Sequence, residues 1–177
     1  MTYKSILKTA DWSDLTPLPS PEDGEVLVSI AYTKQFKDAF EMFRAVLKKG
    51  EKSKRALDLT LELININSAN YTVWYYRRLC LIELKSDLYK ELELTDQLTE
   101  VNVKNYQVWF HRRWLVEKLD DHGCVADELQ TCAELLENDN KNYNAWSHRI
   151  WVNDRFDCWE DELDFANEMI QKDMHNN

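Results

Sequence analysis

Lys104–Arg113 reads KNYQVWFHRR, and closely related words stand on both sides of it. Asn70–Arg78 upstream reads NYTVWYYRR, and Lys141–Arg149 downstream reads KNYNAWSHR. The tryptophans of the three words are 35 and 37 residues apart. Self-similarity at this period is typical of a repeat protein built from one supersecondary unit per repeat.

Each word predicts the start of a helix. Asparagine is a good N-cap, because its side chain accepts a hydrogen bond from a free backbone N–H. Tyrosine and tryptophan follow three residues apart and share a helical face, and arginine comes three residues after each tryptophan. Breaks follow at 85–87, 120–123 and near 156–157, and each precedes a second apolar stripe, which in the last repeat contains Leu163, Ala166, Met169 and Ile170. Each repeat is therefore expected to be a helical hairpin.

The predicted class is all-α: an α-α superhelix, that is, a solenoid of antiparallel helical hairpins forming a right-handed crescent. Residues 1–34 hold all three prolines and are expected to form an irregular lead-in. Residues 35–177 are expected to form the repeats. Apolar spacing predicts the first two helices at 34–49 and 53–66. The predicted divisions are 35–69, 70–104, 105–141 and 142–175, with a further repeat beginning at 176.

A repeat that begins at 176 would be interrupted at once, because the sequence has 177 residues. Solenoids normally finish in a polar capping repeat. We therefore expect a fragment, a truncated product or an incomplete gene model.

Composition narrows the function classes. A net charge of −10 argues against a general nucleic-acid binder, because phosphate contacts require a basic surface. The four cysteines form no C-x-x-C pair and have no zinc-ligand spacing, so we expect reduced thiols and no metal site in this chain. The sequence contains neither a signal-peptide h-region nor an apolar stretch of about 18 residues, and we expect a cytoplasmic protein without stable membrane insertion.

Two lysines precede the predicted helix caps. Lys104 and Lys141 stand next to helix N-termini, where backbone N–H groups and the helix dipole already favour anions. Tyr106 and Tyr143 could add hydroxyl donors. These residues form a candidate phosphate site, although a lysine in this position is more often a solvated surface residue.

A purely structural interpretation competes with this one. In it the tyrosines and tryptophans form the hairpin core, and each arginine bonds carbonyls or acidic side chains of an adjacent repeat. His111 and His148 could act as bases or ligands, but structural hydrogen bonding is the more common role.

The repeated word Asn-Tyr-x-x-Trp-x-x-Arg resembles the repeat of protein prenyltransferase α subunits, and most closely the α subunits shared by farnesyltransferase and type I geranylgeranyltransferase. The similarity extends to Asp11–Pro17 (DWSDLTP), Phe40–Leu47 (FEMFRAVL) and Ser68–Trp74 (SANYTVW), and it covers about 9–177. The resemblance implies a crescent that wraps a β subunit, and an enzyme active only as a heterodimer. Such enzymes move farnesyl or geranylgeranyl from its diphosphate to the cysteine of a C-terminal CaaX motif.

The resemblance also assigns roles to residues. A lysine at the position of Lys104 lies close to the diphosphate leaving group, with the tyrosine at Tyr106 nearby. The glutamine at Gln107 holds the carboxylate of the substrate peptide, and Asn142 and Tyr143 match residues near the diphosphate. The family's zinc, and magnesium with the diphosphate, would come through the β subunit.

One position and two alternatives remain open. Asn144 stands where similar proteins tend to have histidine, so no role carries over there. The α subunit of the Rab-specific geranylgeranyltransferase shares the repeat. A non-catalytic tetratricopeptide-like scaffold has a 34-residue period, but expects glycine at set positions, and 70–105 contains none.

Overall fold

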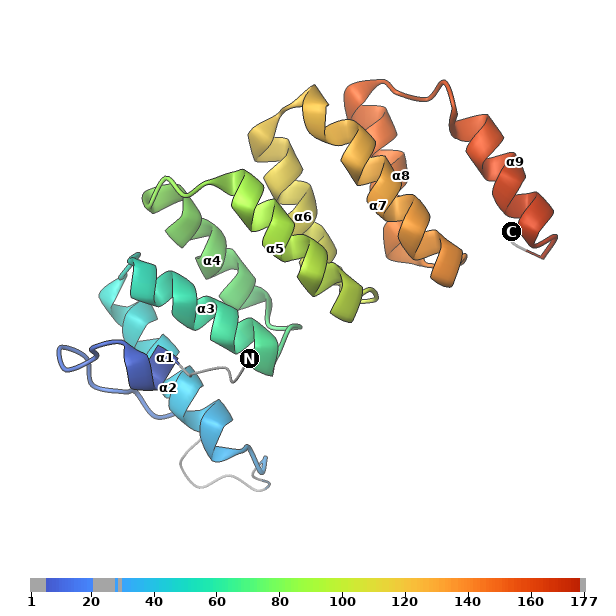
Figure 1. Ribbon diagram of the computed structural model, residues 1–177. Helices are drawn as coiled ribbons and strands as arrows, with labels where there is room; N and C mark the ends of the chain where they lie inside the picture. Colours follow the sequence, from blue (N-terminus) through green and yellow to red (C-terminus); the bar gives the residue numbers. More distant parts are fainter. Residues whose placement is uncertain (1–5, 21–27, 29, 176–177) are drawn as a thin grey trace. The chain divides into compact units, whose positions relative to one another are not determined.

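The computed structural model describes residues 6–20, 28 and 30–175, and every regular element within them is helical (Figure 1). In chain order these elements are α1 (Ile6–Thr9), α2 (Lys34–Lys49), α3 (Lys54–Ile66), α4 (Tyr71–Glu83), α5 (Leu88–Val101), α6 (Tyr106–Leu119), the 3-10 turn η1 (His122–Cys124), α7 (Val125–Asn138), α8 (Tyr143–Phe156) and α9 (Glu162–Lys172). The all-α prediction is confirmed. The repeat expected to begin at 176 lies outside the described residues.

The chain divides into two compact units, Met1–Asp87 and Leu88–Asn177, which we call unit 1 and unit 2. In unit 1 the predicted helix over 34–49 is α2. Gly50 ends it in the left-handed region at φ 67°, a conformation that glycine adopts without strain. Ser53 then caps α3 by accepting a hydrogen bond from the backbone N–H of Ala56.

The lead-in is attached to α3 by aromatic and ionic contacts. Trp12 is buried, and the Arg55 guanidinium lies 4.7 Å from the centroid of its ring. Arg55 also bonds the carboxylates of Asp14 and Glu51. Hydrogen bonding from Arg55 lowers the pKa of Glu51 to about 2. The irregular segment is thus held on the first hairpin.

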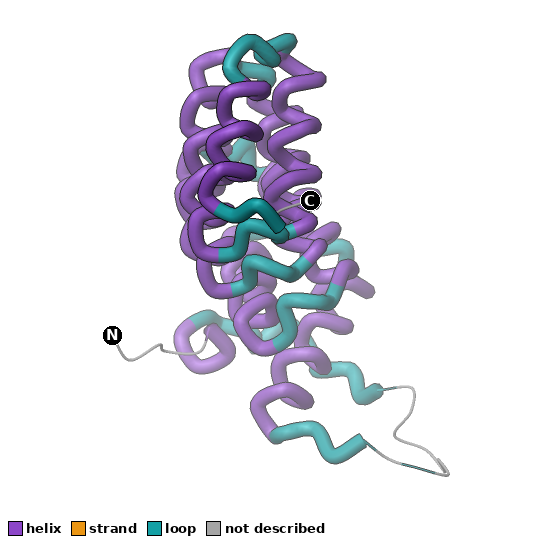
Figure 2. Tube along the Cα trace, turned by 90° about the vertical axis from the view of Figure 1, so that its right-hand side faces the viewer, coloured by secondary structure: helices purple, strands orange, loops and turns teal. Residues whose placement is uncertain are grey.

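In unit 2 the hairpins α5–α6 and α7–α8 pack side by side, and α6 also contacts α8. Helices α6 and α8 run in one direction, and α5, α7 and α9 run in the other (Figure 1). Figure 2 shows helices joined by turns at their ends. The starts of α6 and α8 therefore lie at the same end of unit 2.

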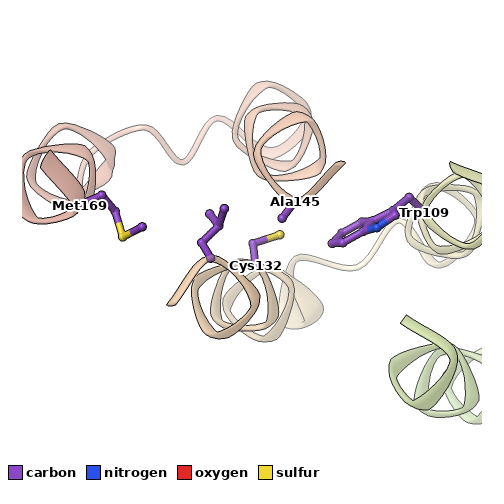
Figure 3. Close-up of a cluster of buried hydrophobic side chains, with 5 residues drawn as sticks. Trp109, Cys132, Ala145 and Met169 are labelled. Carbon is purple, nitrogen blue, oxygen red and sulfur yellow. The ribbon is translucent and has the colours of Figure 1, made fainter. Parts of the chain in front are cut away.

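The core of unit 2 is filled from four helices. Trp109, Cys132, Ala145 and Met169 converge between α6, α7, α8 and α9 (Figure 3), with Leu136 in the same cluster. Burial raises the pKa of Cys132 to about 12, so this thiol behaves as a small apolar side chain.

Each predicted asparagine cap is present. Asn70, Asn105 and Asn142 accept hydrogen bonds from backbone N–H groups in the first turns of α4, α6 and α8. The tryptophan four residues later donates its indole N–H to the carbonyl six residues before it, always at 2.8 Å: Trp74 to Ser68, Trp109 to Val103, and Trp146 to Asn140. Every repeat thus fixes the turn that precedes its own helix.

Two predicted buried faces differ in the structure. The purely structural interpretation placed the repeat tyrosines in the hairpin core, but Tyr106 and Tyr143 are 65% and 68% exposed, as hydroxyl donors at the surface would be. In α9 only Met169 is fully buried, and Leu163 and Ile170 are exposed. Met169 belongs to the expected stripe, but its neighbour in the core is the partly buried Phe165, four residues before it, so the buried face is shifted toward Phe165. Among the residues that the structure describes, no helix has the length and apolar character needed to cross a bilayer.

Candidate functional site

The five predicted site residues lie around the starts of α6 and α8. Lys104 is in the turn before α6, and Tyr106 and Gln107 are the first two residues of that helix. Asn142 caps α8, and Tyr143 is its first residue. The rings of Tyr106 and Tyr143 are 6.4 Å apart between centroids and tilted by 53°. Two helix N-termini and two exposed phenols are therefore neighbours within one unit.

Lys104 is the cation of this group. Its side chain is 76% exposed, and its Nζ lies 3.0 Å from Oδ2 of Asp139, the C-cap residue that follows α7. An exposed ammonium beside two helix N-termini is suited to an anion with several charged oxygens. Sequence reasoning did not find Asp139, because it stands 35 residues away and belongs to no repeated word.

Asn142 has a mainly positional role in the geometry. It is buried, and its Oδ1 accepts a hydrogen bond from the backbone N–H of Ala145 at 3.1 Å. Its Nδ2 donates to the carbonyl of Val103 at 3.5 Å. That carbonyl also accepts the indole bond of Trp109, so the residue immediately before Lys104 is held from two repeats. The turn carrying the lysine is thereby fixed relative to α8.

The tyrosines and Gln107 remain available at the surface. Tyr71 of α4 is 71% exposed, so all three repeat tyrosines project outward. A large aromatic with a polar tip, left exposed at a repeated position, is typical of a surface that contacts a ligand or a partner. Gln107 is half-buried, and its backbone N–H donates to the side chain of Asn105, so its position at the start of α6 is set by the cap. Asn144, at the equivalent position of α8, is buried.

Comparisons by sequence and by structure both find similarity to protein prenyltransferases. The family model described as protein prenyltransferase alpha subunit repeat matches residues 53–84, 88–119 and 125–156, which is more than half of the chain. The chain belongs to this prenyltransferase alpha subunit repeat family. Each matched segment contains one hairpin, α3–α4, α5–α6 or α7–α8, and places the Asn-Tyr-Trp helix second.

The individual relatives are named as subunits of protein farnesyltransferase/geranylgeranyltransferase type-1. The protein farnesyltransferase/geranylgeranyltransferase type-1 subunit alpha of Pisum sativum is 49% identical over 94% of this chain and 50% of its own length. The subunit of that name from Dictyostelium discoideum is 44% identical over 48% of this chain and 26% of its own. A solved structure, Candida albicans protein geranylgeranyltransferase-I complexed with GGPP, matches with a TM-score of 0.85 and 32% identity. That match covers 94% of this chain and 58% of the other.

The chain spans about half the length of the Pisum sativum subunit. The alignment supports the same fold along nearly the whole chain. The residues that recur in the repeats include buried ones, such as Trp109, and exposed ones, such as Tyr106.

A buried ionic network links α5, α6, α7 and α8. Arg112 donates from Nε and Nη2 to the two carboxylate oxygens of Glu128, both at 2.7 Å. His148 lies 2.7 Å from Glu128 through Nε2, and His111 lies 2.9 Å from Glu91 in the same way. Both histidines are buried, so the expectation of structural hydrogen bonding is confirmed.

Burial and the neighbouring charges determine the protonation states of Glu128 and His148. Burial alone would raise the pKa of Glu128, but the hydrogen bond from His148 and the charge of Arg112 hold it below its ordinary value. Burial lowers the pKa of His148, and this effect outweighs its bond with Glu128. Neutral His148 therefore donates from Nε2 to an ionised carboxylate. The repeat arginines bond acids or carbonyls, as expected: Arg77 to Leu57, Arg112 to Glu128 and Asp96, and Arg149 to Glu162 and Leu129.

Side chains that could ligate a metal are scattered rather than grouped. Within 6–20, 28 and 30–175, no three side chains of histidine, cysteine, aspartate or glutamate are close enough together to hold an ion.

Proposed function

We propose that this chain is the α subunit of a heterodimeric protein prenyltransferase. The enzyme transfers farnesyl or geranylgeranyl from its diphosphate to the cysteine of a C-terminal CaaX motif, and it acts in the cytoplasm. The observation that carries the proposal is the exposed Lys104 ammonium beside Tyr106 and Tyr143, at the paired starts of α6 and α8. Membership of the repeat family and the names of the relatives support it.

The chemistry follows from charge. As the bond between the prenyl carbon and the diphosphate breaks, negative charge builds on the departing oxygens. The Lys104 ammonium stabilises that charge, and the N–H groups at the two helix starts contribute their partial positive charge. Tyr106 adds a hydroxyl donor beside the lysine. Since this stabilisation is strongest in the transition state, it acts mainly on kcat.

The other residues bind and orient the substrates. Tyr143 faces the diphosphate from α8, and Asn142 holds that helix start against the Lys104 turn. The amide of Gln107 donates to the terminal carboxylate of the substrate peptide. Zinc, which activates the acceptor thiol, and magnesium, which accompanies the diphosphate, are assigned to the β subunit and the ligand.

Two other functions are less well supported. The α subunit of a Rab-specific geranylgeranyltransferase would use the same repeat. The relatives described above are instead named as type-1 subunits, which favours CaaX substrates. A tetratricopeptide-like scaffold would not require an ammonium at the paired helix starts.

The test is co-expression with candidate β subunits, followed by purification through a tag on the β chain. We expect co-purification, and then prenyl transfer to peptides ending in Ser or Met, or in Leu. Lys104→Ala should lower kcat by roughly 10²-fold, the cost of removing one oxyanion donor, with the heterodimer intact. Lys118→Ala is the matched control, because Lys118 is a lysine in the last turn of α6, at the other end of the helix that Lys104 precedes. Equal turnover of both variants in assembled enzyme would refute the role of Lys104, and absence of transfer with every β subunit would refute the function.

A further inference from the structure

We propose that Asp139 is a positioning residue that directs the Lys104 ammonium toward the diphosphate. The inference rests on the proposed function and adds a residue to it. Asp139 Oδ2 lies 3.0 Å from Lys104 Nζ, and it approaches from the turn that leads into α8. The Lys104 side chain is thus held by a residue of the turn before α8, and not by a residue of α6.

Asp139 is well placed to act as the fixed partner. Its backbone N–H donates to the carbonyl of Leu135 at 3.1 Å, and its carbonyl accepts from the N–H of Asn142 at 3.0 Å. Its side chain is 34% exposed, against 76% for that of Lys104. A lysine stem has several rotatable bonds and loses much conformational entropy when it is ordered. An anchored carboxylate limits the positions that the ammonium can occupy before the substrate binds.

The backbones of the two turns are joined as well. The Val103 carbonyl accepts bonds from Trp109 and from Asn142, which fixes the residue beside Lys104 to the α8 cap. Further along, Asn140 Nδ2 donates to Asp173 Oδ2 at 2.9 Å, so the Asp139 turn is held from its other side. The distance between Lys104 and Asp139 is therefore set by a chain of bonds between three consecutive turns.

Because the ion pair between Lys104 and Asp139 is partly exposed, the expected effect of removing it on kcat is small. An exposed ion pair typically changes an equilibrium constant by roughly two- to fivefold. A positioning effect acts only through the residue that is positioned. We expect Asp139→Asn to lower kcat about two- to fivefold, with the KM for the prenyl diphosphate within about twofold of the parent. In a Lys104→Ala background the same change should have no further effect on kcat.

Three variants make the kinetic test specific. Asp139→Glu keeps the charge and should restore at least half of the lost kcat. Asp120→Asn is the matched control, because Asp120 pairs with Arg155 at the opposite ends of α6 and α8. It should leave both constants unchanged. If Asp139→Asn lowers kcat equally with and without Lys104, the positioning role is wrong and a general structural effect remains.

A second readout does not require activity. The amine of Lys104 can be acetylated in the purified chain, and its rate measured by mass spectrometry against Lys118. An amine held by a carboxylate reacts more slowly, so Asp139→Asn should raise the Lys104 rate about two- to fivefold. An unchanged rate would overturn the inference. If no β subunit supports transfer, the proposed function fails while the labelling rate still decides whether Asp139 holds the amine.

Discussion

Replacing Glu128 with glutamine should destabilise unit 2 strongly, because Glu128 connects two consecutive hairpins. It lies on α7 and is buried, and it accepts bonds from Arg112 of α6 and His148 of α8. The bidentate contact with Arg112 joins the hairpin before it. The contact with His148 joins the second helix of its own hairpin. Losing the carboxylate charge leaves the Arg112 guanidinium buried with one remaining acidic partner.

The size of the effect follows from that remaining partner. Removing one member of a buried ion pair commonly costs about 3–5 kcal/mol in the free energy of unfolding, because the other charge is left uncompensated. Arg112 keeps a bond to Asp96, whose side chain is 46% exposed and can draw on solvent. The lower end of the range, about 3 kcal/mol, is therefore expected. Folded domains have about 5–15 kcal/mol in total, so the loss is a large fraction.

Urea denaturation followed by circular dichroism at about pH 7.5, where the Glu128 carboxylate is ionised, measures the change. Asp120→Asn is again the control: asparagine tolerates the left-handed backbone of this residue at φ 46°, and only an exposed pair is lost. The double variant Arg112→Met/Glu128→Met should lose less stability than Glu128→Gln, because it buries no unpaired charge. A change below about 1 kcal/mol for Glu128→Gln, or no difference from Asp120→Asn, would refute the reasoning.

Three further predictions concern other buried groups. Because the pKa of His148 is lowered from 6.5, the unfolded chain binds more protons, and stability should fall as pH drops below about 6.5. His148→Gln should flatten that part of a melting-temperature profile, and an unchanged slope would contradict it. Trp109→Phe removes the indole bond to Val103, so amide exchange in the 102–105 turn should accelerate several-fold by mass spectrometry, without change at 67–70. Buried Cys132 should resist alkylation at about pH 8 longer than partly exposed Cys158, and equal rates would contradict this.

The helices and their caps were predictable because their signals are local. The Asn caps depend on residues two or three positions away, and Gly50 ends α2 through its own backbone preference. Spacing alone could not tell which aromatic of each repeat is buried. Tyr106 and Trp109 satisfy the same helical periodicity, and only the packing of neighbouring hairpins leaves the tyrosine outside.

Non-local contacts explain what sequence reasoning missed. Asp139 meets Lys104 only because consecutive turns stack, and no short-range pattern connects two residues 35 positions apart. Glu128 was likewise not selected, although the repeat arginines were expected to find acids. The phase of the α9 stripe was misjudged because several phases fit four apolar residues, and Met169 alone shows which one faces the core.

The repeat explains why a site can occupy one place in a nearly symmetrical scaffold. All three words supply a capping asparagine, an exposed tyrosine, and a tryptophan that fixes the preceding turn and is buried in the first two words and partly buried in the third. They differ at the residue before the cap, which is Ala69 in the first word and lysine in the second and third. Lys104 forms an ion pair with Asp139 of the following turn. Asp173, the acid of the next turn, accepts bonds from Asn140 and from the backbone N–H of His175, and the charge of Lys141 also acts on it. The scaffold thus offers an ordered helix start three times, and we place the chemistry at the second start, where Lys104 pairs with Asp139.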